Sequence, residues 1–397
     1  MHGFDQELLA RLDRLRGDGL YRELRRSDSP SGTQIRVGGQ TLLNFASNDY
    51  LGLANEPLLK EAAIKAVEKF GAGAGASRLI CGSQAPHHEL DETLAAFKGT
   101  AAALSFSSGY AAATGAIVAL LGKDDVVVVD KLAHACLIDA ARLCGAKLRI
   151  FDHNDLGDLE KLLRWAADRG ASATGRPRLL IVTESVFSMD GNHAPLRELV
   201  ELKDRYGAWL MVDEAHATGL YGQHGRGLAE DAGVGERVEV QMGTLSKAIG
   251  AAGGYIAGSR ALIDYLINRA RTFIFTTAPP PAAAAAATAG IELVQSAEGA
   301  RRRRALWEHV AAFRGQQSSP TSEAQSAILP ILVGNETEAV DAAAALRARG
   351  IFLPAVRYPT VARGKARLRL TLTAAHTEED LSRLRQALLE LHLIRNQ

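Results

Sequence analysis

The sequence predicts an α/β fold, with a mainly parallel, doubly wound sheet and a smaller α+β domain. Between about residue 100 and residue 260, short apolar runs alternate with helical patterns. The runs are almost continuously apolar, which is typical of strands that are buried on both faces of a parallel sheet by helices. After the proline triplet at 279–281 and an alanine-rich helix, three further apolar runs alternate with helices and indicate the smaller domain.

Each element is predicted from its own stretch of sequence. The expected strands of the large domain are 101–106, 125–130, 147–152, 179–184, 208–214 and 238–243, with helices at 109–121 and 134–144. The expected elements of the small domain are strands 326–333, 351–356 and 366–373 and helices 335–349 and 377–392. The N-terminus has leucines at mostly helical spacing, which predicts an amphipathic helix. We expect segment 1–49 to pack with the small domain, 50–292 to form the large domain and 293–397 to form the small one.

Composition argues for a soluble protein that acts on small molecules. The 397 residues include 46 basic and 45 acidic ones, so net charge favours neither a nucleic acid nor a membrane as partner. No apolar run reaches the roughly 18 residues that a membrane span requires. The N-terminus has no apolar signal region; an Arg-rich transit peptide is a minority interpretation because acidic residues are interspersed. Cys81, Cys136 and Cys144 show no paired spacing, which favours reduced thiols and a cytoplasmic protein.

Polar side chains recur where the expected strands of the large domain end. They are Ser107 to Gly109, His134, Glu184 with Ser188, Asp213 with His216, and Thr244 with Lys247. In an open parallel sheet, ligands bind outside the carboxyl ends of the strands. Each residue alone is a weak indication, but their recurrence after successive strands predicts a site at that edge of the sheet.

A lysine follows the last of these strands, in GTLSKAIG (243–250). Lys247 lies between small residues and can reach into a crevice to form a Schiff base, provided that its pKa is lowered. Pyridoxal phosphate (PLP) meets this requirement, because the lysine nitrogen becomes part of the bound cofactor. The alternative interpretation is an exposed loop lysine.

The segment MVDEAHATG (211–219) places a carboxylate at the end of an apolar strand. Buried there, Asp213 needs a cationic partner, and a protonated pyridine nitrogen provides one while turning the ring into an electron sink. His216 could then bond the phenolic oxygen of the ring. The string DEAH also occurs in helicases, but the chain has no GxxxxGK[ST] phosphate loop to accompany it.

The turn SSGY (107–110) lies between a strand and a helix. Backbone N–H groups at a helix N-terminus bind phosphate well, although a plain strand–helix turn is the alternative. The segment GAGAGA (71–76) fits a dinucleotide fingerprint formally, but it follows a helical stretch rather than a strand. His134 could stack on a cofactor ring or be structural. The run RRRR (301–304) is expected to be a solvated helix face, with a contact for an acidic carrier protein or a nucleotide phosphate as the alternative.

Taken together, seven segments resemble the α-oxoamine synthase family of fold-type I PLP enzymes, across nearly the whole chain. These segments are NFASNDYLGL (44–53), FSSGY (106–110), DKLAHACL (130–137), ESVFSMDG (184–191), MVDEAHATG (211–219), GTLSKAIG (243–250) and RYPTVARGKARLRLTLTAAHT (357–377). The resemblance implies a fold-type I PLP-dependent transferase, in which residues 50–292 bind the cofactor. It also implies an acyltransferase that joins an amino acid to an acyl thioester.

The resemblance also assigns roles to individual residues. Lys247, Asp213, His134 and His216 are the implied catalytic residues: the cofactor lysine, the pyridinium partner, the group stacked on the ring and a partner of its phenolic oxygen. Further implied cofactor contacts are Ser188 at the phenolic oxygen, Glu184 beside it, Gly109, Tyr110 and Thr244 at the phosphate, and Thr276 and Thr277 reaching in from a second subunit. The implied substrate contacts are Asn48 and Arg357 for the amino-acid carboxylate, His134 beside it, and Arg22 and Thr360 for the acyl donor. No metal is expected.

The implied assembly is a homodimer with a shared active site. The C-terminal segment and GLYRELR (19–25) favour a member that uses L-alanine and a pimeloyl thioester, delivered by coenzyme A or by an acyl carrier protein. The segment ICGSQ (80–84) is similar to that of a glycine-using relative. Another fold-type I enzyme, such as an aminotransferase, and a non-catalytic protein with the same fold are more remote alternatives.

Overall fold

The structure is a computed structural model that describes residues 3–168, 177–314 and 326–394. It divides into two compact units: residues 48–305, the large unit, and residues 1–47 with 306–397, the small unit. The second boundary lies within helix α12 (Ala297–Arg314), rather than at the expected 292/293. No helix in the described ranges is long and apolar enough to cross a bilayer.

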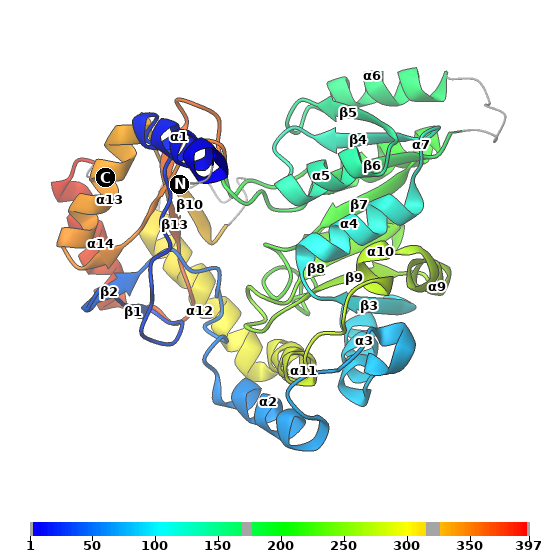
Figure 1. Cartoon of the computed structure of the whole chain (residues 1–397), viewed down its shortest axis with the longest axis horizontal. Coiled ribbons are helices and arrows are strands. Elements are labelled where there is room, and N and C mark those ends of the chain that lie inside the picture. The colour runs from blue at the N-terminus through cyan, green and yellow to red at the C-terminus, as the bar shows by residue number, and fades with distance from the viewer. Residues whose placement is uncertain (1–2, 169–176, 315–325, 395–397) are drawn as a thin grey trace. The chain divides into compact units, whose positions relative to one another are not determined.

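A seven-stranded sheet organises the large unit (Figure 1). In spatial order the strands are β3 (Ala102–Phe106), β9 (Gly254–Gly258), β8 (Val240–Thr244), β7 (Trp209–Asp213), β6 (Leu179–Glu184), β4 (Val126–Asp130) and β5 (Lys147–Phe151). The five strands from β8 to β5 are parallel, and only β9 runs against its neighbours. This confirms the predicted fold class and all six predicted strands of this sheet.

Strand β9 is absent from the sequence-based prediction, and its glycines explain the omission. Gly254 and Gly258 bound a run of only three other residues, so the segment resembles a turn more than a strand. Both glycines are required by packing: a Cβ on Gly254 would lie 2.5 Å from the backbone nitrogen of Gly109, and one on Gly258 would lie 2.7 Å from a backbone oxygen of Glu239.

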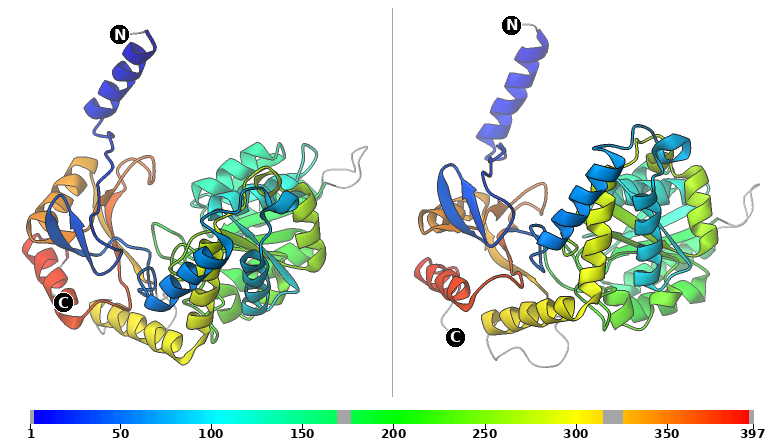
Figure 2. Two further views of the ribbon diagram at one scale, coloured as in Figure 1. Left: turned by 60° about the horizontal axis from the view of Figure 1, so that its bottom comes forward. Right: turned by 90° about the horizontal axis from the view of Figure 1, so that it is seen from below.

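Helices cover both faces of this sheet. Helices α4 (Gly109–Leu120) and α5 (Ala135–Leu143) pack on each other, as do α6 (Leu156–Ala167) and α7 (Leu196–Tyr206). From β3 through β4 to β5 the chain moves toward the β5 edge of the sheet, and from β5 through β6 to β7 it moves back. Because crossovers between parallel strands are right-handed, this reversal places α4 and α5 on one face of the sheet and α6 and α7 on the other. The remaining helices are α2 (Pro57–Phe70), α3 (Ala85–Lys98), α8 (Leu228–Asp231), α9 (Arg260–Arg269), α10 (Arg271–Ile274) and α11 (Pro281–Gln295), with short helices at Arg78–Gly82 and Gly235–Arg237. Helix α11 lies alongside α2 and α3 (Figure 2).

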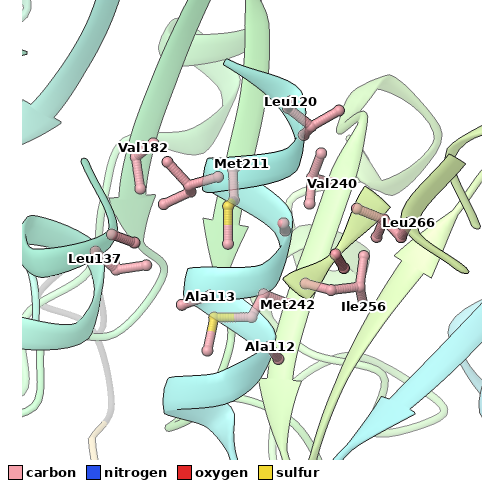
Figure 3. Packing of buried hydrophobic residues seen from close by; sticks show 14 of the residues in the cluster. Ala112, Ala113, Leu120, Leu137, Val182, Met211, Val240, Met242, Ile256 and Leu266 are labelled. Carbon is pink, nitrogen blue, oxygen red and sulfur yellow. The ribbon is translucent and has the colours of Figure 1, made fainter. Parts of the chain in front are cut away.

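The core of the large unit centres on α4. Its small residues let the helix approach the sheet, where Met211, Val240, Met242 and Ile256 pack against it (Figure 3). Leu137 of α5 and Val182 of β6 extend this cluster. The rigid layer beneath α4 fixes the position of its N-terminus, which lies at the carboxyl edge of the parallel strands.

Two three-stranded sheets make up the small unit. One contains β1 (Gln34–Val37), β2 (Gln40–Asn44) and β11 (Ile351–Phe352), and the other β10 (Ile328–Gly334), β13 (Ala366–Thr371) and β12 (Ala355–Val356). The single strand expected at 351–356 was wrong, because it divides at Leu353-Pro354 and its halves join different sheets. A proline cannot donate to a ladder of hydrogen bonds, which accounts for the break. The expected helices are present as α13 (Glu336–Ala348) and α14 (Glu378–Glu390).

The N-terminal segment reaches the small unit through β2, which pairs in parallel with β11. Helix α1 (Gly3–Gly17) forms where the leucine spacing predicted a helix, but none of its residues is buried. Phe4, Leu8, Leu9 and Leu15 are exposed on it. The N-terminal residues therefore contribute two strands, β1 and β2, to this unit, whereas the helix contributes no buried side chain.

Candidate active site

Polar side chains gather at the carboxyl edge of the large sheet, where the sequence predicted a site. Glu184 ends β6 and Asp213 ends β7, and the two residues are opposite each other in the register of these parallel strands. Lys247 follows β8 and acts electrostatically on both carboxyl groups and on His134. The sheet thus brings together groups from segments more than a hundred residues apart.

Lys247 belongs to a chain of hydrogen bonds that connects it, through His216 and Tyr50, with Asn48. Its Nζ is 2.8 Å from Nε2 of His216, and Nδ1 of His216 is 2.6 Å from the hydroxyl of Tyr50. That hydroxyl donates to Oδ1 of Asn48 at 3.3 Å. With this direction of donation, His216 donates from Nδ1 to Tyr50 and accepts from Lys247 at Nε2. Tyr50 and His216 are both buried, so this chain of hydrogen bonds has a fixed geometry.

Asp213 is a buried carboxylate with one backbone partner. Its Oδ1 accepts from the N–H of Ala215 at 2.8 Å. Burial raises the pKa of Asp213, while the positive charge of Lys247 opposes this shift. A second cation beside this carboxylate would hold it ionised.

Glu184 differs from its neighbour in having an oxygen without a partner. Oε2 accepts from the N–H of Ser188 at 3.3 Å, whereas Oε1 has no hydrogen-bond partner in the described part of the chain. Burial raises the pKa of Glu184 to about 8, the negative charge of Asp213 adds to the shift, and Lys247 opposes it. Two buried carboxyl groups side by side cannot both ionise readily, which agrees with the raised pKa of each.

His134 begins α5 and is exposed at the same edge of the sheet. Its Nδ1 accepts from the backbone N–H of Cys136 at 3.3 Å, so the histidine is the N-cap of this helix. Partial burial lowers the pKa of His134; the charge of Asp213 opposes this and that of Lys247 adds to it. The imidazole is therefore neutral near pH 7.

The N-terminus of α4 forms a cradle of backbone N–H groups. The side chain of Ser108 caps the helix by accepting from Ala111, which leaves the N–H groups of Gly109 and Tyr110 without acceptors inside the helix. Thr244 lies against Gly109, since a Cβ on that glycine would be 3.6 Å from the Cβ of Thr244. These groups surround a position suited to an anion.

The hydroxyl groups at this cradle are already ordered. Thr244 donates to the carbonyl oxygen of Gly253 at 2.9 Å, and its Oγ1 is 2.8 Å from Oγ of Ser246. Ser246 is exposed and was not among the predicted residues. Tyr110 directs its hydroxyl away to Asp139, at 2.9 Å, so only its backbone is available to an anion.

Thr276 and Thr277 lie after α10, away from the groups described above in sequence. Thr277 forms an isolated β-bridge with Ser77, and its side chain is exposed. Their expected role concerns a second subunit, so it stays a prediction.

The predicted substrate residues of the small unit line a groove of about 720 Å³. Nη2 of Arg22 is 3.3 Å from Oγ1 of Thr360, and Nη2 of Arg357 donates to the carbonyl oxygen of Tyr21 at 2.9 Å. Two further arginines, Arg25 and Arg347, line the same groove. Within the described ranges, none of these four guanidinium groups forms an ion pair with a carboxylate, and a groove of this kind suits an anionic ligand.

The arginine run is not the solvated face that the sequence suggested. Arg303 is buried and donates to the carbonyl oxygen of Val294, and Arg302 pairs with Glu56 and Glu298. Arg301 also pairs with Glu298 and, with Arg304, remains exposed. Two of the four arginines, Arg302 and Arg303, therefore make structural contacts that hold the start of α12 in place. Arg303 contacts the end of α11, and Arg302 contacts the backbone at Leu51 and Gly52.

Sequence reasoning missed Tyr50 and Ser246 as site residues. Tyr50 lies in the segment NFASNDYLGL, but 166 positions separate it from its partner His216. Only the fold brings the two together. Ser246 stands two residues from Thr244 and one from Lys247, so its position in GTLSKAIG was the available signal.

Comparison with known proteins agrees with this geometry. Residues 40–388 match the family described as aminotransferase class I and II. The 8-amino-7-oxononanoate synthase of Geotalea daltonii is 46% identical over 386 residues, covering 96% of each chain. The protein called 8-amino-7-oxononanoate synthase 1 in Bacillus velezensis is 42% identical and covers 98% of each chain.

Solved structures share the fold along most of the chain. The serine palmitoyltransferase of Sphingomonas wittichii has a TM-score of 0.88 at 30% identity and covers 99% of each chain. A serine palmitoyltransferase described with a PLP internal aldimine has the same score and identity, with 98% of each chain covered. An 8-amino-7-oxononanoate synthase from Francisella tularensis has a TM-score of 0.72 at 27% identity and covers 88% of this chain and 98% of its own.

Proposed function

The chain belongs to the α-oxoamine synthases within the class I and II aminotransferase family, and from this membership we propose that it carries out the reaction of 8-amino-7-oxononanoate synthase. This is a PLP-dependent acyl transfer in biotin biosynthesis. L-Alanine condenses with pimeloyl-CoA or a pimeloyl-carrier protein, and 8-amino-7-oxononanoate, carbon dioxide and free thiol are released. The observation that carries the proposal is 42–47% identity to several synthases of that name over nearly the whole chain.

The large-unit site fits PLP on physical grounds. The buried carboxylate of Asp213 is stabilised by a neighbouring cation, and the N-terminus of α4 can bind an anion. Lys247 provides a nucleophilic amine at the same edge of the sheet. One molecule that carries a pyridinium nitrogen, a phosphate and an aldehyde satisfies all three. When bound, PLP supplies an electron sink that stabilises negative charge at the substrate Cα.

Lys247 is placed both to hold the cofactor and to move a proton. Its Nζ lies 2.8 Å from Nε2 of His216, so the free amine has a hydrogen-bond partner that orders it. A positioned lysine that takes the Cα proton contributes about 10²–10⁴-fold to the rate. Asp213 would hold positive charge on the ring nitrogen of PLP, Ser188 and His216 would bond its phenolic oxygen, and His134 would stack on the ring.

Four residues are proposed to contact the substrates. Arg357 and Asn48 bind the carboxylate of alanine, since the guanidinium of Arg357 has no carboxylate partner among the described residues. Arg22 and Thr360 line the acyl-donor site and are already hydrogen-bonded to each other. The four arginines that line the groove favour a substrate with more than one negative group, which pimeloyl-CoA has in its carboxylate and its phosphates.

A homodimer completes the proposed site. Thr276 and Thr277 of one subunit would contact the phosphate held by the other, which is consistent with the exposure of Thr277. The protein would act in the cytoplasm on small molecules, with an acyl carrier protein as a further partner. No nucleic acid or membrane takes part.

Glycine- or serine-using synthases, such as a 2-amino-3-ketobutyrate CoA ligase, are the second candidate. The structural likeness to serine palmitoyltransferases at 30% identity favours this alternative specifically. The choice depends on a methyl group at Cα, which is worth only about 1–3 kcal/mol in a pocket. An aminotransferase would need neither Thr360 nor a site for an acyl thioester.

Thiol release distinguishes these activities. The PLP-loaded protein is mixed with L-alanine, glycine or L-serine, and pimeloyl-CoA or acetyl-CoA is added while free thiol and the cofactor spectrum are recorded. We expect thiol release with alanine and pimeloyl-CoA. Release with glycine and acetyl-CoA alone would move the assignment to the ligase, and absence of thiol with every pair would overturn the family reaction.

A further inference from the structure

Cys136 is a buried thiol that the proposed reaction does not use, and it lies against the imidazole of His134. Its Sγ is 3.1 Å from Nδ1 of His134, and the residue is 3% exposed. Cys144, at the other end of α5, instead donates to the backbone oxygen of Ala141 at 3.1 Å. Of these two thiols on one helix, only Cys136 is directed at a residue of the site.

The backbone fixes which nitrogen of His134 carries the proton. The N–H of Cys136 is 3.3 Å from Nδ1, in the N-cap arrangement that starts α5. A backbone N–H can only donate, so Nδ1 must present its lone pair. In a neutral imidazole the proton then resides on Nε2.

Because Nδ1 presents its lone pair to the backbone, the thiol 3.1 Å away acts as a donor to the same nitrogen. Burial raises the pKa of Cys136 far above its usual range, so the group stays S–H at neutral pH. A proton on Nδ1 would leave the backbone N–H without its acceptor, and the thiol would have to rotate so that sulfur, a weak acceptor, received that proton. The thiol therefore adds to the tautomer preference that the helix cap sets.

We propose that Cys136 is a positioning residue that holds His134 in the Nε2–H tautomer. His134 then presents a hydrogen-bond donor at the sheet edge it shares with Asp213 and Lys247, and Nε2 has no lone pair with which to take a proton. His134 can bind an oxygen of the substrate or cofactor, but it cannot be the base at Cα. Which oxygen it meets rests on the proposed function, whereas the tautomer itself does not.

Three variants separate the thiol from the helix around it. Cys136→Ser keeps a donor at Nδ1, Cys136→Ala removes it, and Cys144→Ala removes the other thiol of α5 without touching His134. The tautomer is read in the apoprotein labelled with [¹⁵N]histidine, from two-bond ¹H–¹⁵N correlations of the ring. The His134 signals are assigned by their loss in His134→Gln.

We expect Nδ1 to be unprotonated and Nε2 protonated in the wild type, in Cys136→Ser and in Cys144→Ala. Cys136→Ala should show a larger fraction of the Nδ1–H form and a kcat about 2- to 10-fold lower, the range expected for loss of one hydrogen bond. Should Cys136→Ala fold poorly, Cys136→Val replaces it as a variant without a donor.

The proposal is overturned if Nδ1 carries the proton in the wild type, or if the variants without a donor match the wild type in tautomer and kcat. A shift of equal size in Cys144→Ala would also overturn it, because the effect would then belong to the packing of α5. Failure of the proposed reaction looks different, because the apoprotein would keep its tautomer pattern while no thiol is released with any substrate pair.

Discussion

The two units bury ionisable groups in opposite ways. In the large unit, burial raises the pKa of Glu184 to about 8, and its Oε1 has no hydrogen-bond partner among the residues that the structure describes. In the small unit, burial lowers the pKa of His376 to about 4, yet both ring nitrogens have partners, in the N–H of Thr373 and the carbonyl oxygen of Asn44. His376 also stacks on Phe45.

From this difference we expect Glu184, rather than His376, to have a functional role. A fully bonded, stacked imidazole is a structural element that happens to be titratable. An acid with an unused oxygen, beside a second buried acid and a lysine, is costly to fold and has no structural benefit in the isolated chain. In the small unit, by contrast, four arginines line the open groove that we propose for the substrates.

The largest effect is expected from Lys247→Ala. This change removes the amine that holds the cofactor and moves the Cα proton, so kcat should fall by about 10³-fold or more. Borohydride reduction of the PLP-loaded protein, followed by peptide mass spectrometry, should place the cofactor on Lys247 in the wild type and nowhere in the variant. The exposed Lys69 provides the control, since Lys69→Ala should retain both the label and the activity. A label on another lysine of the variant would contradict the assignment.

Glu184→Gln tests whether the buried carboxyl group of Glu184 destabilises the large unit. The folded pKa of about 8 lies above the ordinary value of 4.5, so the folded apoprotein loses stability relative to the unfolded chain as pH rises from about 4.5 to 8. A glutamine cannot ionise, and the variant should become more stable than the wild type over that window, by an amount on the order of 3–5 kcal/mol at pH 8.

Urea unfolding of the two apoproteins at pH 5 and pH 8 measures this difference. A gap that is equal at both pH values would show that the carboxyl group is not strained in the folded protein. Serine at position 188 gives a control, because Ser188→Ala leaves the Glu184 carboxyl and its backbone partner in place.

His376→Gln tests the buried imidazole of the small unit, for which we expect the opposite pH dependence of stability. The folded pKa of about 4 lies below the ordinary 6.5, so the wild type loses stability as pH falls from about 6.5 to 4, by about 3 kcal/mol. A glutamine can accept from Thr373 and donate to Asn44 without titrating. The variant should therefore lose less stability on acidification, which urea unfolding at pH 7 and pH 4.5 would show. Equal losses in both proteins would place the acid-sensitive group elsewhere.

The sequence predicted the positions of the polar residues in these regions better than their contacts. The strands that end at Glu184 and Asp213, and the strand that Lys247 follows, were identifiable because continuous apolar runs end in polar residues. Strand β9 was missed because its glycines are required for packing, a property that only neighbouring backbone reveals. The chain of hydrogen bonds from Lys247 to Tyr50 and the thiol beside His134 depend on where segments meet in space, so periodicity and spacing could not supply them.

The smallest effect we expect concerns the open groove of the small unit. Arg357→Ala removes a guanidinium that has no carboxylate partner among the described residues, so no buried charge is left behind and folding should be unaffected. The KM for L-alanine should rise about 10- to 100-fold, the range for a lost charge-assisted contact. Arg349→Ala is the matched control: Arg349 pairs with Glu390 and does not line the groove. If both variants raise the KM equally, general electrostatics rather than a direct carboxylate contact would explain the effect of Arg357. The proposed role of the groove in substrate binding would then be wrong.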